Sequence, residues 1–503
     1  MQCDNFKKRT IMKKLILKAF ALTVLTGGVA GCGNSFLETD YYKGIDQETA
    51  LNSVDNISTA LNGAYYQLYR YYFAGNYATT IGDIPTDLAY WNKGTQHFND
   101  IYAYTVVDTD TYLYWIWNYG YKVIDNAARL IEAVDALYAD STEDEKAQLD
   151  LCKAEAYALR GYAQLVLVNI FAHQVKVNGT DFSSKPGIVL VDKPIKPLEK
   201  VERSTVGQSY TAIVNDLKDA LTHFTAAGGD RGDLFYFGEA AVHGLLARTY
   251  LYMEEWDDAA AEAQNALDAK GITTLTYGKD TYKALYNGGA SNTESMFALA
   301  INSSQNWQAQ SCGTIWSTYD YSPSPWLQSI YEGTDCRTSV WVLSGTANSP
   351  EFNGGKFAHF SSGNNTYGTC YIVNAPEMFL IIAEANAQSS TGSVSDAQNA
   401  LLTVAKRNSA IASVSDLPST KADLMTFIKD ERARELFQEG LRLYDLRRWD
   451  VQAQVYATGA PNISFTYTNY KISDLVYPIP NDEITSGFGV AQNEGWSSTL
   501  PSR

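Results

Sequence analysis

Aromatic and amide side chains are the residues of this sequence best suited to form a binding site. The chain holds 35 tyrosines and 10 tryptophans in 503 residues. A sugar ring presents C–H groups on its face and hydroxyl groups at its rim. An aromatic ring can therefore pack against the face, while amides and carboxylates bond the rim. The composition favours a neutral polyhydroxyl ligand, although the same rings could instead pack the core.

Several of these rings fall close together in the second half of the chain. Trp316, Tyr319 and Tyr321 stand beside a proline, and this spacing predicts that the three rings share an exposed turn. Trp307 and Trp326 flank them. We expect this segment to form one wall of a binding site, with the alternative that each ring is a core residue.

Catalytic motifs are absent from the sequence. It has five histidines and none of the HExxH, GxSxG or GxxxxGK[ST] patterns that mark metalloproteases, serine hydrolases and phosphate-binding loops. A glycosidase needs two carboxylates facing each other at about 5–10 Å, and no pair stands out among the 56 acidic residues. We therefore expect a binding protein with no cofactor and no metal. A glycan-active enzyme remains the alternative.

The first 31 residues have the pattern of a secretory signal. Lys13 and Lys14 precede a short apolar stretch over residues 15–29, and small residues then lead to Cys32 in the order Val-Ala-Gly-Cys. This order predicts a lipoprotein signal over residues 1–31 and a lipid on the Cys32 sulfur. An ordinary cleaved signal is the alternative, and Met12 is a second candidate start. No later apolar run is long enough to span a bilayer, so the lipid would be the anchor.

The charge of the chain excludes one class of partner. Its net charge is −17, and the segment before Cys32 holds six basic residues and one acidic residue, so the remainder carries −22. Nucleic acid needs a basic face to neutralise its phosphates. We therefore expect no nucleic-acid partner, and strongly anionic ligands are also disfavoured.

Four cysteines remain beyond Cys32, and their spacings fit no metal site. Cys152 lies in a helical pattern and is expected to be a buried thiol. Cys312 and Cys336 could pair in an oxidising compartment, with free thiols as the alternative.

Apolar residues recur at three- and four-residue steps through much of the chain, which predicts helices. Thr205 and Gln208 form a capping box that opens one helix, and a run of glycines from residue 228 breaks it. We expect further helices over residues 48–73, 111–136 and 144–172.

Two segments carry the spacing of a tetratricopeptide-type hairpin, in which a knob on one helix meets small residues on the other. In residues 237–269, Trp256, Ala259 and Ala266 stand at offsets of three and seven, and residues 376–407 repeat these offsets. A generic helical hairpin is the alternative.

These patterns predict an all-α protein with one domain over residues 32–503. Its helical repeat frame would cover about residues 48–270 and 372–449. Residues 271–371 are rich in Gly, Ser, Asn, Thr and aromatics, and we expect a loop-rich insertion that carries function. Residues 450–503 are expected to be irregular.

Five short motifs along the chain resemble those of one known family. They are FLE at residues 36–38, AEAYALR at 154–160, ERARELFQEGLRLYDLRRW at 431–449, YPIP at 477–480 and QNEGW at 492–496. Together they resemble the SusD-like (RagB/SusD) family of outer-membrane nutrient-binding lipoproteins. The resemblance implies about four tetratricopeptide-like hairpins with an irregular ligand-binding region. It also implies a partner, a SusC-like TonB-dependent outer-membrane transporter, which the protein covers as a lid and supplies with oligosaccharide.

The same resemblance bears on residues 83–92, which read DIPTDLAYWN. The PTD turn looks like the loop that carries stacking tryptophans in starch-binding members, which implies a ligand role for Trp91, with a buried loop anchor as the alternative. Tyr90 and Asn92 have suitable chemistry beside it. The glycan-binding residues that we expect are therefore Trp91, Tyr90, Asn92, Trp316, Tyr319 and Tyr321.

The arginine-rich motif at residues 431–449 has a structural interpretation. Glu435 and Glu439 would stand four apart on one helix, where neighbouring positive charge lowers the pKa of a carboxyl and keeps it ionised. We therefore expect an ion-pair network rather than a catalytic acid pair. By resemblance to the family, Asp335 and Arg337 are also structural.

Two further functions stay open within this interpretation. Some relatives capture peptides, which would make the protein a peptide-binding lid of the same type of transporter. A repeat protein could also act only as an adaptor without a small ligand. The aromatic pair at residues 90–91 favours a glycan over a peptide, and the adaptor stays an alternative that a binding measurement tests.

Overall fold

The computed structural model describes residues 50–92, 94–304, 306–341, 343–346, 349–451, 456–457 and 475–500. The chain divides into two compact units, residues 1–50 and 51–503, and nearly all of the described residues belong to the second. The expected signal over residues 1–31, Cys32 and the motif at residues 36–38 lie outside the described residues.

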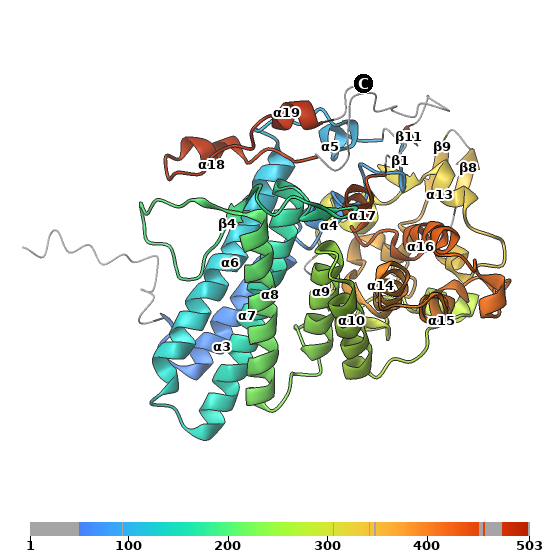
Figure 1. The fold of residues 1–503 in the computed structure, drawn as a ribbon. Coiled ribbons are helices and arrows are strands. Elements are labelled where there is room, and N and C mark those ends of the chain that lie inside the picture. Colours follow the sequence, from blue (N-terminus) through green and yellow to red (C-terminus); the bar gives the residue numbers. More distant parts are fainter. Residues whose placement is uncertain are drawn as a thin grey trace, which may run out of the picture. The chain divides into compact units, whose positions relative to one another are not determined.

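Long helices form a frame in which each helix packs against the next one along the chain (Figure 1). Taken in order they make four pairs, which confirms the expected all-α fold of tetratricopeptide-like hairpins. The pairs are α3 (Val54–Tyr69) with α6 (Thr111–Tyr138), α7 (Glu143–Phe171) with α8 (Val206–Ala227), α9 (Glu239–Tyr252) with α10 (Trp256–Lys270), and α14 (Ala375–Gln388) with α15 (Val394–Ala405).

Local signals set the ends of these helices. The expected capping box opens α8, where the Thr205 side chain accepts from the Gln208 N–H and the Gln208 side chain accepts from the Thr205 N–H. The helix ends at Gly228, whose φ of +83° is a left-handed conformation that glycine adopts without strain. The capping box at Thr142 and Glu145 opens α7 in the same way.

Small residues bring the frame helices close together, as the repeat spacing predicted. Ala241 and Ala259 are fully buried between α9 and its neighbours. A Cβ atom built on Gly244 of α9 would lie 2.5 Å from Cγ1 of Val373, so no larger residue fits there without movement. This close packing explains the run of small residues in the hairpin pattern.

The arginine-rich motif is not one helix, and this part of the prediction is wrong. Helix α16 (Lys421–Leu436) ends before α17 (Arg442–Trp449) begins. Gln438 and Gly440 between them have φ of +70° and +75°. Asp83 holds the turn by accepting from the N–H groups of Gly440 at 3.0 Å and Arg442 at 3.2 Å. These contacts over a distance of more than 350 residues outweigh the helical propensity of the segment.

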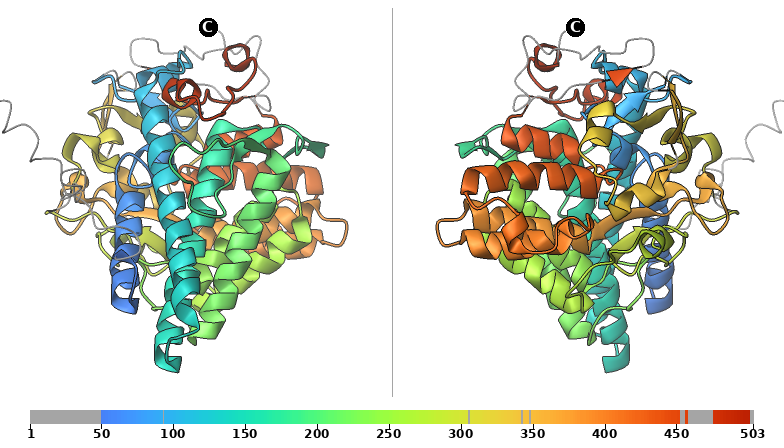
Figure 2. Two further views of the ribbon diagram at one scale, coloured as in Figure 1. Left: turned by 90° about the vertical axis from the view of Figure 1, so that its left-hand side faces the viewer. Right: turned by 90° about the vertical axis from the view of Figure 1, so that its right-hand side faces the viewer.

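Residues 271–371 contain short elements joined by loops. In the right-hand view of Figure 2, the yellow elements of this segment lie to the right of the orange helices α14–α16. The short elements are α11 (Lys279–Ala284), β6 (Ser295–Leu299), α12 (Cys312–Ile315), β7 (Tyr321–Pro323), α13 (Pro325–Ser329), β8 (Leu343–Thr346), β9 (Ser349–Phe352) and the first two residues of β10 (Cys370–Asn374), with 3-10 turns at Gln308–Gln310, Cys336–Val340, Gly355–Phe357 and Asn365–Tyr367.

The remaining elements connect the frame helices or follow them. They are α4 (Tyr77–Thr80), β1 (Ala89–Trp91), α5 (Asn99–Ala103), β2 (Lys176–Val177), β3 (Thr180–Asp181), β4 (Pro186–Val189), β5 (Arg203–Thr205), a 3-10 turn at Val414–Asp416, β11 (Tyr456–Ala457), α18 (Asn481–Thr485) and α19 (Trp496–Thr499). Strand β1 lies between β11 and β7, and the other described strands pair two by two, as β10 with β6, β2 with β3, β4 with β5 and β8 with β9.

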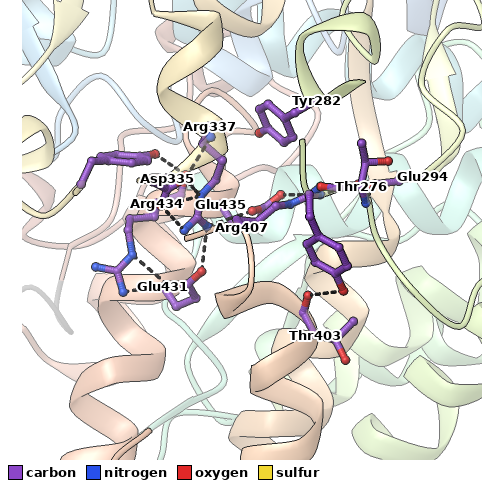
Figure 3. Close-up of polar contacts among 12 residues, drawn as sticks. Thr276, Tyr282, Glu294, Asp335, Arg337, Thr403, Arg407, Glu431, Arg434 and Glu435 are labelled. Carbon is purple, nitrogen blue, oxygen red and sulfur yellow. Dashed lines mark hydrogen bonds and ion pairs between the residues drawn. The ribbon is translucent and has the colours of Figure 1, made fainter. Parts of the chain in front are cut away.

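A buried ion-pair network joins the insertion to the frame (Figure 3). Arg337, in the insertion, bonds Glu431 at 2.7 Å and Glu435 at 2.9 Å, both on α16. Glu435 also accepts from Arg407 at 3.3 Å, and Arg407 pairs with Glu294. The structure therefore confirms the structural interpretation of these charges, including Arg337 with its partner Asp335 at 2.7 Å.

The pKa values of the carboxyl groups in this region are not all shifted in the same direction. Burial opposes ionisation of Glu431, but Arg337 and Arg434 outweigh it and lower its pKa to about 2. The pKa of Glu435 is also lowered, because Arg407 and Arg337 outweigh its burial. The expectation is wrong for Glu439, whose pKa is raised by burial although Lys356 bonds it.

The four described cysteines are buried free thiols, as expected for Cys152. Cys312 and Cys336 are not joined. The Sγ atom of Cys312 instead lies 3.7 Å from that of Cys370, because β10 packs beside α12 at the loop around Gly75.

Within the described ranges, no helix combines the length and the apolar character needed to cross a bilayer.

Candidate functional site

The two segments that the sequence singled out meet in the structure. Strand β1 pairs antiparallel with β7, which places Trp91 opposite Tyr321 and Tyr90 opposite Ser322. The N–H of Asn92 extends the pairing by donating to the carbonyl of Asp320 at 2.8 Å. The aromatic loop after the PTD turn and the wall in the insertion are therefore parts of one small sheet.

Most of the expected ligand rings in this sheet are buried. Trp316 and Tyr321 are 1% and 0% exposed, so the expectation of a shared exposed turn is wrong for both. The Trp316 ring instead packs edge-on against Phe437 at 5.1 Å. Tyr319 is 43% exposed, as expected. Tyr90 is also buried.

Trp91 and Asn92 are half-buried, and both hold the loop in place. The Trp91 ring lies 5.5 Å from the buried ring of Tyr102. The Asn92 side chain donates to the carbonyl of Ser317 at 3.3 Å and accepts from the Ser322 hydroxyl at 3.2 Å. Both side chains therefore anchor the loop, which is the role that the alternative gave to Trp91.

A polar clamp fixes the exposed Tyr319 beside the frame. Nδ1 of His97 lies 2.8 Å from Oδ2 of the buried Asp320, and the Tyr319 ring is 5.9 Å from the His97 ring. Nε2 of His97 lies 3.2 Å from Nε2 of Gln310. The backbone carbonyl of Gln310 accepts a hydrogen bond from the Asn76 side chain at 2.7 Å. The clamp thus joins Tyr319 to the turn at Gln308–Gln310 that follows Trp307.

Half-buried rings gather beyond this clamp, at the end of α3 and along α6. We call this group the aromatic surface. Rings of Tyr72 and Trp115 stack at 4.4 Å, and Trp307 lies 5.0 Å from Tyr69. Its members are Tyr66, Tyr69, Arg70, Tyr71, Tyr72, Trp115, Tyr119 and Trp307.

Arg70 lies at the centre of the aromatic surface. Its guanidinium carbon is between 5.0 and 5.6 Å from the ring centres of Tyr66, Tyr71, Tyr72 and Trp307. Such cation–π contacts orient the guanidinium and the rings together. Burial and the neighbouring Tyr72 raise the pKa of Tyr71 to about 12, so its hydroxyl stays protonated and available as a donor.

A pocket of 390 Å³ opens beside the aromatic surface and shares Tyr66 and Tyr69 with it. Its volume falls within the range of small-ligand sites, about 300–1,000 Å³. Tyr66 is 44% exposed, and the Tyr236 hydroxyl donates to the Asn62 amide at the pocket wall. The pocket is lined by Asn62, Tyr65, Tyr66, Tyr69, Phe235, Tyr236, Ala298, Leu299 and Ala300.

Among the expected residues, only Trp307 of the wall expected in the insertion belongs to the aromatic surface. The sequence analysis placed residues 48–73 and 111–136 in helices and gave their rings no binding role. The signal was the run Tyr69-Arg70-Tyr71-Tyr72, because consecutive side chains at a helix end cannot all face the core.

Two carboxyl groups with a strongly raised pKa make structural bonds. Burial raises the pKa of Asp83 to about 7, and this side chain holds the turn at Gly440. Burial also raises the pKa of Glu155 to about 7, where it pairs with Arg231. In the part of the chain that the structure describes, no cluster of histidine, cysteine or acidic residues is arranged to hold a metal ion.

The frame and the aromatic surface together define a helical-repeat protein suited to binding by ring stacking. Two family models match the chain. One, described as starch-binding and associating with the outer membrane, matches residues 35–251, and the other, described as the SusD family, matches residues 355–496. The chain belongs to the SusD-like family, which confirms the resemblance found in its motifs.

A curated SusD-like protein of Formosa agariphila is 21% identical over 275 residues, which cover 53% of this chain and 48% of that protein. The chain thus spans about half the length of this relative.

Solved structures share the fold. A SusD superfamily protein from Bacteroides thetaiotaomicron has a TM-score of 0.74 at 22% identity, covering 88% of this chain and 99% of that one. A putative sugar binding protein from Bacteroides vulgatus has a TM-score of 0.76 at 24% identity, covering 89% and 100%.

Proposed function

We propose that this protein binds an oligosaccharide or polysaccharide on the aromatic surface and passes it to a SusC-like TonB-dependent transporter in the outer membrane. The observation that carries the proposal is the group of half-buried rings around Arg70, in a chain whose family is described as starch-binding. A half-buried ring is fixed on one side by packing and offers the other side to the C–H face of a sugar.

The residues expected from the sequence have different parts in this proposal. Tyr319 extends the aromatic surface, to which it is joined through His97 and Gln310, and Trp91 lies in the neighbouring strand β1. Trp316 and Tyr321 are buried and support the sheet, of which Tyr321 is a part, without touching the ligand.

The proposal includes a lipid on Cys32 that holds the protein at the outer face of the outer membrane. Its support is the residue pattern before Cys32 and the family description, which names the outer membrane. More than one acyl chain makes such an anchor durable. Cells grown with labelled palmitate should label the wild-type chain and not Cys32→Ser. Label retained in Cys32→Ser, or protection of the protein from protease added to intact cells, would contradict this part.

Binding is tested by calorimetry or affinity electrophoresis with a panel of glycans. Trp307→Ala should weaken binding by about tenfold or more, because a central aromatic contact is lost. Trp256→Ala is the matched control, since this ring is also half-buried but lies at the start of α10, outside the aromatic surface.

Three results would count against glycan binding at this surface. No glycan of the panel binds, the two variants lose affinity equally, or peptides compete for binding while glycans do not. Release of free sugars by the purified protein would favour the glycan-active enzyme.

A further inference from the structure

Arg70 differs from most arginines of the frame in what neutralises it. Arg160, Arg248 and Arg432 form buried ion pairs with carboxylates at 2.6–2.7 Å. No ion pair joins Arg70 to a carboxylate within the described ranges. The ionisable groups beside it are tyrosines, and its Nη1 donates to the Tyr66 hydroxyl at 2.9 Å.

The guanidinium of Arg70 has hydrogen-bonding capacity to spare. Its Nε is buried and donates to no described group. A guanidinium that stacks on aromatic rings uses its flat faces and keeps its in-plane N–H groups for hydrogen bonds. An incoming carboxylate or sulfate could accept two such bonds at once.

A second cation lies on the same surface. Nζ of Lys122, an exposed side chain of α6, is 4.2 Å from the centre of the Tyr119 ring. Tyr119 also lies beside Arg70, and its ring is tilted against that of Tyr72 at 4.9 Å between centres. The aromatic surface therefore carries two positive charges without a matching acid among the described side chains, in a chain whose net charge is −17.

We propose that the glycan bound here is acidic and that Arg70 bonds a carboxylate or sulfate group on its sugars, with Lys122 adding to the attraction. This inference rests on the proposed glycan function and narrows its substrate class. It replaces the neutral ligand expected from the sequence, because local charge acts on a bound group more strongly than net charge at a distance.

The test compares matched pairs of glycans in calorimetry. Each acidic oligosaccharide, either a uronate or a sulfated sugar, is paired with its carboxyl-reduced or desulfated counterpart. Arg70→Gln should weaken binding of the acidic member by about tenfold or more and leave the neutral member within about twofold. Arg70→Lys should restore part of the loss, and added salt should weaken wild-type binding to the acidic member.

Arg129→Gln serves as the control, because Arg129 lies on α6, the helix that carries Lys122, but pairs with Asp125 at 2.7 Å. The uronate and sulfate arms distinguish the two sources of negative charge.

The outcomes separate this inference from the proposed function. Equal affinity for acidic and neutral members, or an Arg70→Gln variant that binds both like wild type, overturns the acidic ligand while Trp307→Ala still tests glycan binding. Loss of all glycan binding in wild type overturns both. A loss in Arg129→Gln equal to that in Arg70→Gln would show a general effect of charge and overturn the role of Arg70.

Discussion

At the scale of single residues, several buried side chains leave one polar atom without a hydrogen-bond partner among the described groups. Glu155 is one of them, because its Oε2 accepts no hydrogen bond there. Its side chain is fully buried on α7, and Arg231, its partner, is partly open to solvent. Burial therefore dominates and raises the pKa of Glu155 to about 7.

This shift predicts a pH dependence of stability with a definite sign. The folded pKa lies above the ordinary value of 4.5, so the contribution of Glu155 is fully present below about pH 4.5 and is lost as the pH rises through 7. At about 1.4 kcal/mol per pKa unit, the loss is about 3–4 kcal/mol. Glu155→Gln does not titrate.

The measurement is denaturant unfolding of both proteins from pH 4.5 to 8. The free energy of unfolding of wild type should fall relative to that of Glu155→Gln over this range. A difference between the two proteins that stays constant with pH would contradict the assignment.

At the scale of elements, the helices were predicted from the sequence and the connections were not. The expected helix over residues 111–136 is Thr111–Tyr138 in the structure, and that over 144–172 is Glu143–Phe171. Periodicity and capping residues are local signals, so they are readable without the fold. The break between α16 and α17 is not local, because it depends on Asp83 from the distant PTD loop.

The candidate site was predicted in chemistry but only partly in residues. Aromatic enrichment indicated ring stacking, and the pairing of Trp91 with Tyr321 brings the two expected segments together. Exposure could not be read from the sequence, because Trp316 and Tyr319 have similar neighbours in the chain and opposite environments in the fold. The aromatic surface needs the packing of α3 on α6, which no local pattern states.

Two glycines give an opposed pair of predictions at this scale. A Cβ atom on Gly440 would lie 2.3 Å from the carbonyl oxygen of Thr79, and the residue has φ of +75°. Gly440→Ala should therefore destabilise the protein by about 3 kcal/mol or more, through strain and a backbone clash. Gly63 lies on α3 with nothing within 4 Å of a built Cβ.

Gly63→Ala should stabilise the protein by about 0.5–1 kcal/mol, because alanine loses less backbone entropy in a helix. Thermal unfolding of the two variants measures both effects. Equal shifts in the same direction would show that the turn at Gly440 is not the close approach described.

At the scale of the whole molecule, the described insertion is held to the frame through shared charges as well as through apolar packing. Arg337 reaches two carboxylates on α16 while its own partner, Asp335, comes from the insertion. The core of the frame would survive without these pairs, but the insertion would lose a fixed contact to α16.

Arg337→Met tests this coupling. Removing one member of a buried network leaves the others unpaired, so the free energy of unfolding should fall by about 3–5 kcal/mol. Arg129→Met should cost less than about 1 kcal/mol, because its ion pair with Asp125 is partly exposed. Limited proteolysis should cut Arg337→Met first within residues 271–371. Unchanged stability and unchanged cleavage would contradict the coupling.

The network also predicts sensitivity to acid. The pKa of Glu431 is lowered to about 2, so its contribution is present above about pH 4.5 and is lost as the pH falls through 2. Acid unfolding followed by circular dichroism should therefore begin at higher pH in Arg337→Met than in wild type.

The aromatic surface has an uneven origin along the chain. Seven of its eight members lie between residues 66 and 119, and Trp307 alone comes from the insertion. A chimera that exchanges residues 271–371 between two relatives would then take most of the aromatic surface, including Arg70, from the parent that supplies the N-terminal part. Under the proposed function, such an exchange would change the rim of the site while Arg70, and with it the proposed preference for an acidic ligand, would come from the N-terminal parent.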